Sequence, residues 1–188
     1  GQGVKTGYPG CYNLDCQGFV QTSNAWRLGG SWRRYSVEGG DDVGVTFSFL
    51  LYNGDWWLQL DGQNVGYYPG RVYGNGPMSR GAGRALWGGE TFDVHQMDNP
   101  DGTWPPMGSG EFANAGYQHA AYHKQVSYYS TDLRRYPASM TPWSECEQTY
   151  SLEYHHNGGA WGSYFFFGGP GGPVGACNSA AAKSVVYF

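Results

Sequence analysis

Pairs of turn-forming residues divide this chain into short segments and limit the folds that it can adopt. The pairs recur about every 8 to 14 residues between Gly29 and Gly102, and once more at Asn157-Gly158. Regularly spaced short segments favour strands in a sandwich or barrel over helices. The pairs are Gly29-Gly30, Gly39-Gly40, Asn53-Gly54, Asp61-Gly62, Asn75-Gly76, Gly88-Gly89, Asp101-Gly102 and Asn157-Gly158.

The segments between these turns have the character of strands. Aromatic residues make up 18% of the chain, and aromatic side chains are enriched in strands. Residues 43–52 alternate apolar with small or polar side chains, and Asn53-Gly54 then predicts a hairpin. Further strands are expected in 55–60, 64–69, 125–130 and 163–169, and only 112–124 and 178–184 would tolerate a helix. We predict an all-β protein with little helix.

Length and charge narrow the class further. The chain has 188 residues, which suits a single domain with one core, and 178–188 reads as a C-terminal tail. The net charge of −4 argues against nucleic acid as a partner. Because no apolar stretch approaches 18 residues, no membrane-spanning helix is predicted.

The four cysteines, Cys11, Cys16, Cys146 and Cys177, indicate an oxidised, extracellular protein, because their number is even and lysine is scarce. Three disulfide connectivities are possible, and a metal site is the alternative. Disulfides are favoured because no C-x2-C pattern or matching histidine spacing accompanies the cysteines. The five histidines show no convergent third ligand, so neither a metal nor another cofactor is expected.

Aromatic residues also suggest a binding surface. Trp56 and Trp57 point to opposite faces of one predicted strand, so one of them is expected on the solvent side, where aromatic rings bind a sugar face or a proline ring. The alternative is that these residues are ordinary core aromatics. The candidate binding residues are Trp57, Gln59, Tyr67, Tyr68 and Trp87.

One carboxylate, Glu90, lies in an otherwise apolar, strand-like run, 85–94. Either it points to solvent from a strand edge, or it lies on a desolvated, aromatic-lined face and acts as a general acid or base. Hydrolysis by carboxylates normally uses two such groups. Glu90 is therefore a candidate catalytic residue on condition that a second carboxylate joins it.

Five stretches in sequence order resemble the neprosin domain, the domain of secreted glutamic peptidases that cleave next to proline. The resemblance implies an antiparallel β-sandwich of two bent, jelly-roll-like sheets, with disulfides Cys11–Cys16 and Cys146–Cys177. It also implies that Glu90 matches one of the family's two catalytic glutamates. The stretches are 6–21, 56–73, 87–93, 105–122 and 162–172.

The sequence departs from this family at its start. The family's other catalytic glutamate precedes the "GCYN" motif, whereas the ten residues before Cys11 contain no acid. The sequence thus resembles the C-terminal three quarters of the domain without its first strands. Glu38, the earliest glutamate, lies in a Glu-Gly-Gly-Asp-Asp turn and is not expected to replace the missing acid.

Three functions follow as hypotheses. The first is a secreted binding or self-assembling structural module that is inactive as a peptidase on its own. The second is a proline-directed glutamic endopeptidase whose second glutamate comes from an upstream fragment or another chain. The third is a carbohydrate-binding β-sandwich. Partners under these hypotheses are proline-containing peptides, another extracellular polymer, or further copies of the chain.

Self-association is expected because a missing strand leaves sheet edges unpaired, and bare edges recruit other strands. The apolar segment 184–188, beyond the last cysteine, is predicted to be free for donation to another chain.

Overall fold

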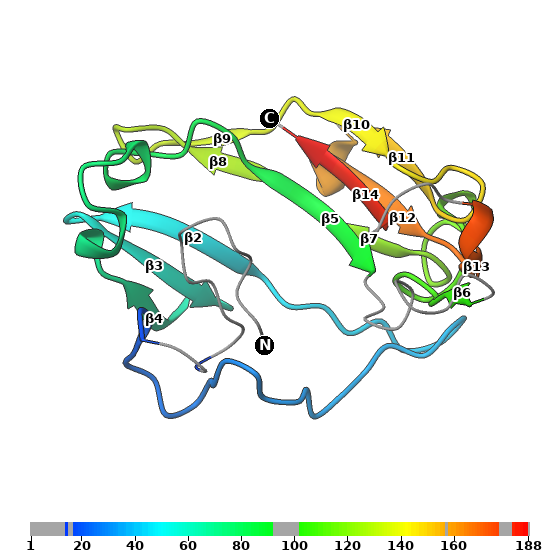
Figure 1. The fold of residues 1–188 in the computed structure, drawn as a ribbon, viewed down its shortest axis with the longest axis horizontal. Coiled ribbons are helices and arrows are strands. Elements are labelled where there is room, and N and C mark those ends of the chain that lie inside the picture. The colour runs from blue at the N-terminus through cyan, green and yellow to red at the C-terminus, as the bar shows by residue number, and fades with distance from the viewer. Residues whose placement is uncertain (1–13, 15–16, 92–101, 157, 177–181, 188) are drawn as a thin grey trace. The chain divides into compact units, whose positions relative to one another are not determined.

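A computed structural model describes residue 14 and residues 17–91, 102–156, 158–176 and 182–187 (Figure 1). The chain divides into two compact units. Unit 1 comprises Gly1–Ser36 and Asp42–Gly83, and unit 2 comprises Val37–Asp41 and Arg84–Phe188.

The described residues of unit 1 form one four-stranded antiparallel sheet, built mainly from local hairpins. Its order is β1-β4-β3-β2. Asn53 and Gly54 have φ values of 50° and 82°, and Asp61 and Gly62 have 47° and 75°. Two successive positive φ angles are typical of tight hairpin turns, for which Asn-Gly and Asp-Gly are the preferred pairs. The elements are β1 (Val20–Gln21), β2 (Phe47–Tyr52), β3 (Asp55–Leu60), β4 (Gln63–Tyr68) and the 3-10 turns η1 (Gly70–Tyr73) and η2 (Pro77–Ser79).

The described residues of unit 2 form two three-stranded and two two-stranded antiparallel sheets. The three-stranded sheets have the orders β10-β14-β5 and β11-β12-β7, and the two-stranded sheets pair β13 with β6 and β8 with β9. The strands are β5 (Leu86–Thr91), β6 (Thr103–Trp104), β7 (Ala121–His123), β8 (Ser127–Tyr129), β9 (Arg135–Pro137), β10 (Thr141–Ser144), β11 (Ser151–His155), β12 (Tyr164–Gly168), β13 (Gly172–Pro173) and β14 (Ala182–Tyr187). The 3-10 turns are η3 (Ala113–Ala115), η4 (Gly159–Trp161) and η5 (Val174–Ala176).

Strand β12 forms the centre of the core of unit 2, because both of its faces are covered. Phe165 and Phe167 belong to a buried cluster that includes Trp104, Met107 and Tyr150. Phe166 points the other way, into a second cluster with Ala113 and Ala120. Burial on both faces explains why this strand is a nearly continuous aromatic run rather than an alternating one.

The prediction of an all-β protein with little helix is confirmed: the sheets are antiparallel, and the helical turns in the described residues are short 3-10 turns. The segment 112–124 forms η3 and β7, not a long helix. The alternating run at 43–52 becomes a strand only from Phe47. Within the described residues, no helix is long and apolar enough to cross a membrane. The single domain and the two-sheet sandwich stay predictions.

The expectation that 184–188 is a free strand for donation is wrong for the described residues of that segment. Strand β14 lies between β10 and β5 of the same chain (Figure 1). Val185 pairs with Trp143 on one side and with Gly88 on the other. The segment therefore completes a sheet of its own chain, and self-association stays a prediction without this strand as its cause.

Candidate active site around Glu90

The strand that carries Glu90 is fixed from beneath by the core of unit 2. Trp87 packs against the buried cluster around Phe165 and Phe167. Two residues on, a Cβ atom added at Gly89 would lie 2.7 Å from both Met107 Sδ and Phe167 Cε2. Glycine is needed here because the backbone of β5 lies directly on these side chains. Close packing thus explains one glycine of the "WGGE" stretch.

A buried hydrogen-bonded chain holds the end of β5. The Thr91 hydroxyl donates to the Tyr150 hydroxyl at 3.2 Å, and Tyr150 donates to the carbonyl oxygen of Pro105 at 2.7 Å. Thr91 is 8% exposed and Tyr150 is fully buried. A buried polar group that loses its hydrogen-bond partner destabilises the folded state. These two hydrogen bonds therefore hold Thr91, the residue next to Glu90, in place.

His123, on β7, is the third contact beneath the strand. Its ring stacks on Phe167 at 5.4 Å and lies 5.0 Å from the ring of Phe165. Burial among these rings lowers the pKa of His123 below its usual value, and a hydrogen bond to the backbone of Gly88 partly opposes this shift. The imidazole therefore favours its neutral form within the core.

Glu90 itself is exposed. Because side chains alternate along a strand, it lies on the face of β5 opposite Trp87 and Thr91. Leu86, 57% exposed, shares the face of Glu90, and Lys183 of β14 is its register partner. One face of β5 is thus packed against the core, and the other face carries the exposed carboxylate of Glu90. An exposed carboxylate in a fixed position can accept a proton or a hydrogen bond from a bound ligand.

The candidate binding residues of unit 1 divide between two faces of its sheet. Trp57 and Tyr67 are register partners whose ring centroids lie 4.6 Å apart. Gln59 shares their face, donating to Asn64 Oδ1 at 2.8 Å and accepting from Ser48 Oγ at 3.1 Å. Tyr68 points to the opposite face, where its ring lies 5.0 Å from that of Phe19. Three of the four candidates of this unit are thus brought together.

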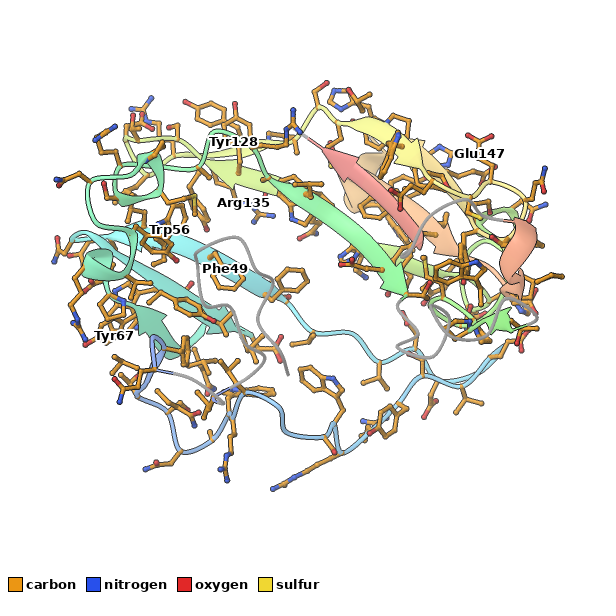
Figure 2. The ribbon with its side chains drawn as sticks, viewed as in Figure 1. Phe49, Trp56, Tyr67, Tyr128, Arg135 and Glu147 are labelled. Atoms are coloured by element: carbon orange, nitrogen blue, oxygen red, sulfur yellow. The ribbon has the colours of Figure 1, made fainter. Side chains whose placement is uncertain are left out.

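Trp56 also lies on the face opposite Trp57, and its indole N–H donates to the carbonyl oxygen of Met78 at 2.7 Å. Figure 2 shows Phe49, Trp56 and Tyr67 on the neighbouring strands β2, β3 and β4. Both tryptophans are half-buried, so neither is the fully solvent-facing member of the pair.

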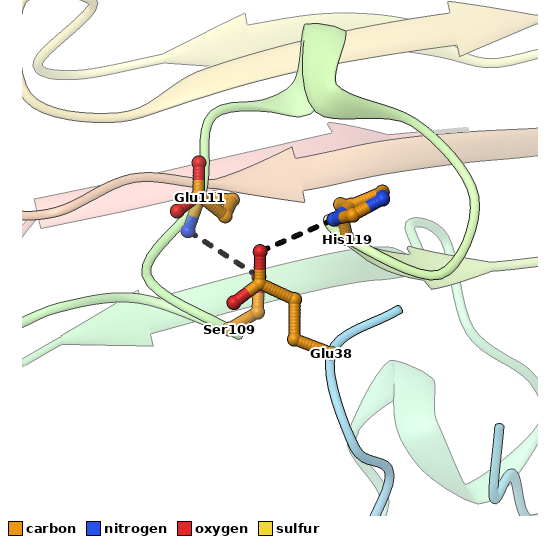
Figure 3. Close-up of polar contacts among 4 residues, drawn as sticks. All are labelled: Glu38, Ser109, Glu111 and His119. Carbon is orange, nitrogen blue, oxygen red and sulfur yellow. Dashed lines mark hydrogen bonds and ion pairs between the residues drawn. The ribbon is translucent and has the colours of Figure 1, made fainter. Parts of the chain in front are cut away.

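Sequence reasoning assigned no role to Glu38, yet its carboxylate lies 3.1 Å from Nδ1 of His119 (Figure 3). The backbone N–H of Gly39 donates to the carbonyl oxygen of Gln118 at 2.9 Å and fixes the same two segments. In the same view, the Glu111 N–H donates to Ser109 Oγ at 3.3 Å. Glu38 and His119 are 81 positions apart and both are exposed, so no local sequence pattern predicts that they contact each other. Exposed ion pairs of this kind contribute little to stability.

The cysteines are only partly within the described residues. Cys146 is 4% exposed and takes part in a disulfide. Cys11, Cys16 and Cys177 lie outside the described residues, so both pairings stay predictions. In the part of the chain that the structure describes, no three His, Cys, Asp or Glu side chains are grouped so that they could hold a metal ion.

The fold and this site define an all-β protein with a carboxylate on a clamped strand. A comparison with protein families identifies the group: residues 3–170 match the model of the Neprosin family. The chain belongs to the neprosin family.

Proposed function

We propose that this chain is an extracellular domain that binds extended, proline-containing peptides. We further propose that Glu90 is one carboxylate of a glutamic peptidase pair. The second carboxylate is supplied from outside these 188 residues, so the isolated polypeptide binds peptide without cleaving it.

The position of Glu90 is the observation that carries the catalytic part. Its carboxylate is exposed to a ligand, whereas Trp87, Gly89 and Thr91 fix its strand from the opposite face. An accessible carboxylate on a strand that the core holds in place can be reached by a bound peptide, as general acid–base catalysis requires. Family membership supports the same assignment, because Glu90 lies within the matched residues.

The face of Trp57, Gln59 and Tyr67 supports the binding part. Two aromatic rings 4.6 Å apart offer flat apolar surface for a proline ring. Gln59 adds polar groups beside them, as in the recognition of extended peptide backbones. The buried, oxidised Cys146 is consistent with the extracellular environment that we propose.

The test compares the 188-residue chain with the same chain supplied with an upstream segment that carries a glutamate, fused or as a separate polypeptide. We expect the chain alone to bind a proline-containing peptide in calorimetry without hydrolysing it at acid pH. The supplemented protein should hydrolyse the peptide, and Glu90→Gln should abolish turnover while leaving binding within about threefold.

Glu153→Gln is the matched control, because Glu153 is another exposed glutamate on a strand, β11. It should leave both binding and turnover unchanged. Hydrolysis by the unsupplemented 188 residues that disappears in Glu90→Gln would show that the second carboxylate lies within them. Tight binding of a neutral glycan in place of the peptide would support the carbohydrate-binding hypothesis instead.

A further inference from the structure

Two aromatic rings of unit 2 contact an ammonium group at the surface, and a third ring packs against both of them. We name Tyr117, Tyr122, Trp161 and Lys124 the Trp161 cluster. The Nζ atom of Lys124 lies 5.2 Å from the ring centroid of Trp161 and 5.5 Å from that of Tyr122. Both distances are within the range of attractive cation–π contacts.

The rings are inclined to one another like the walls of a cage. Trp161 and Tyr117 are perpendicular, with centroids 5.3 Å apart. Tyr122 lies 5.0 Å from Trp161 at 45° and 6.1 Å from Tyr117 at 60°. Trp161 and Tyr122 both present a ring face to the same ammonium group, the contact by which aromatic cages recognise quaternary ammonium groups, and Tyr117 packs edge-on beside them.

The cage is held in place before any ligand arrives. Behind it, the ring of Trp161 lies 5.2 Å from that of Tyr164 and 5.8 Å from that of Phe166. The carbonyl oxygen of Trp161 accepts the N–H of Gln125 at 2.8 Å, so η4 is fixed beside the residue that follows Lys124. Preorganised walls reduce the entropy lost when a ligand binds.

A ligand can reach the Trp161 cluster from the solvent on the side of its two exposed residues. Tyr117 is 48% exposed and Lys124 is exposed, whereas Tyr122 and Trp161 are half-buried. An external cation therefore reaches the rings once the flexible side chain of Lys124 moves aside. A primary ammonium is strongly hydrated, whereas a quaternary ammonium has no N–H groups to desolvate.

We infer that the Trp161 cluster is a binding site for a quaternary ammonium group, and that Lys124 occupies the site in the absence of this ligand. The chemistry is that of choline, either as a free small molecule or as the headgroup of a lipid. The inference does not depend on peptide binding or on Glu90.

The test titrates the full chain with choline chloride, with sodium chloride at equal ionic strength as the reference, and follows the Trp161 indole and the Lys124 methylene protons by NMR. Ring currents should shift the Lys124 protons upfield in the free protein. Choline should return them toward solvent values in a saturable manner while it shifts the Trp161 signal.

Lys124→Gln removes the internal competitor and should strengthen choline binding about two- to fivefold, the equivalent of one exposed cation–π contact. Trp161→Leu should abolish binding, and Tyr117→Leu should weaken it. The second variant changes an exposed ring that the core does not need. Trp143→Leu is the matched control, since Trp143 is an exposed tryptophan outside the cluster, 44% exposed on β10.

Two further arms distinguish the sources of the ligand. Sedimentation with phosphatidylcholine vesicles, but not with phosphatidylglycerol vesicles, would assign a lipid headgroup, and binding of choline alone would assign a free small molecule. The inference is overturned if choline gives no saturable shift in either the wild-type chain or Lys124→Gln. It is also overturned if Trp161→Leu and Tyr117→Leu bind choline with unchanged affinity.

Discussion

The two units are both rich in aromatic residues, but they use them differently. Of the fourteen buried hydrophobic residues in the described part of the chain, twelve belong to unit 2. In unit 1 only Leu58 and Val65 are in this group, whereas Phe49 is 50% and Tyr52 51% exposed. An aromatic strand is therefore not evidence of a core. In unit 2 many rings are buried in the core, and in unit 1 many remain exposed.

The largest test of this contrast replaces one phenylalanine in each unit. Phe165→Ala removes a fully buried ring from unit 2 and should lower the free energy of unfolding by about 3 to 5 kcal/mol. Phe49→Ala, at a half-exposed position in unit 1, should cost about 1 kcal/mol or less. Urea unfolding followed by circular dichroism measures both. Equal losses would mean that the sheet of unit 1 is as tightly packed as that of unit 2.

A second pair of variants adds a methyl group instead of removing a ring. Gly89→Ala places a Cβ 2.7 Å from Met107 and Phe167, and such overpacking should cost about 1 to 3 kcal/mol. Gly44→Ala in unit 1 meets nothing within 4 Å and should change stability by less than about 0.5 kcal/mol. The same unfolding curves test this, and an undiminished stability of Gly89→Ala would show that β5 can move off the core.

The polar networks of the two units should differ in the same direction. Tyr150→Phe removes the hydroxyl that joins Thr91 to Pro105 inside unit 2, at a cost of about 1 to 1.5 kcal/mol. Gln59→Ala removes two partly exposed hydrogen bonds in unit 1 and should cost about 0.5 kcal/mol or less. Thermal unfolding of both variants measures these losses. A larger loss of stability in Gln59→Ala than in Tyr150→Phe would contradict the expected difference between the two units.

The smallest expected effect concerns pH. The four histidines within the described residues belong to unit 2, and the pKa of His123 is lowered in the folded state by burial. The unfolded chain therefore binds more protons at this residue, so its contribution to stability is present above about pH 6.5 and is lost as the pH falls through the lowered value.

We expect His123→Gln to reduce the loss of stability between neutral and mildly acid pH, measured by urea unfolding at several pH values. His155→Gln, at an exposed position on β11, is the control and should leave the slope unchanged. An unchanged slope in His123→Gln would show that His123 does not cause the acid sensitivity of unit 2.

The sequence predicted best what depends on neighbouring residues. The Asn53-Gly54 and Asp61-Gly62 pairs marked two hairpins that the structure contains, since the turn conformation is determined by the two residues themselves. The aromatic run at 163–169 became β12 almost residue for residue. Secondary structure of this kind requires no knowledge of distant contacts.

Features that depend on distant residues were beyond sequence reasoning. Nothing near Thr91 in the sequence indicates Tyr150, 59 positions away, and nothing near Glu38 indicates His119. The pairing of β5 with β14 joins residues 91 to 101 positions apart, a contact that no local pattern indicates, and 184–188 was therefore expected to be free. The motif "WGGE" identified Glu90 as a candidate. Only the packing of Gly89 and Thr91 shows that the opposite face of β5 is the one that the core covers.

The central position of β14 also affects how the protein is made. The two strands that flank it, β5 and β10, precede it in the chain and are synthesised before residues 182–187. Until then their inner edges carry backbone groups that await a partner, and unpaired edges attract other chains. This sheet therefore cannot close before residues 182–187 are made, and until then its open edges are positions at which another chain could pair.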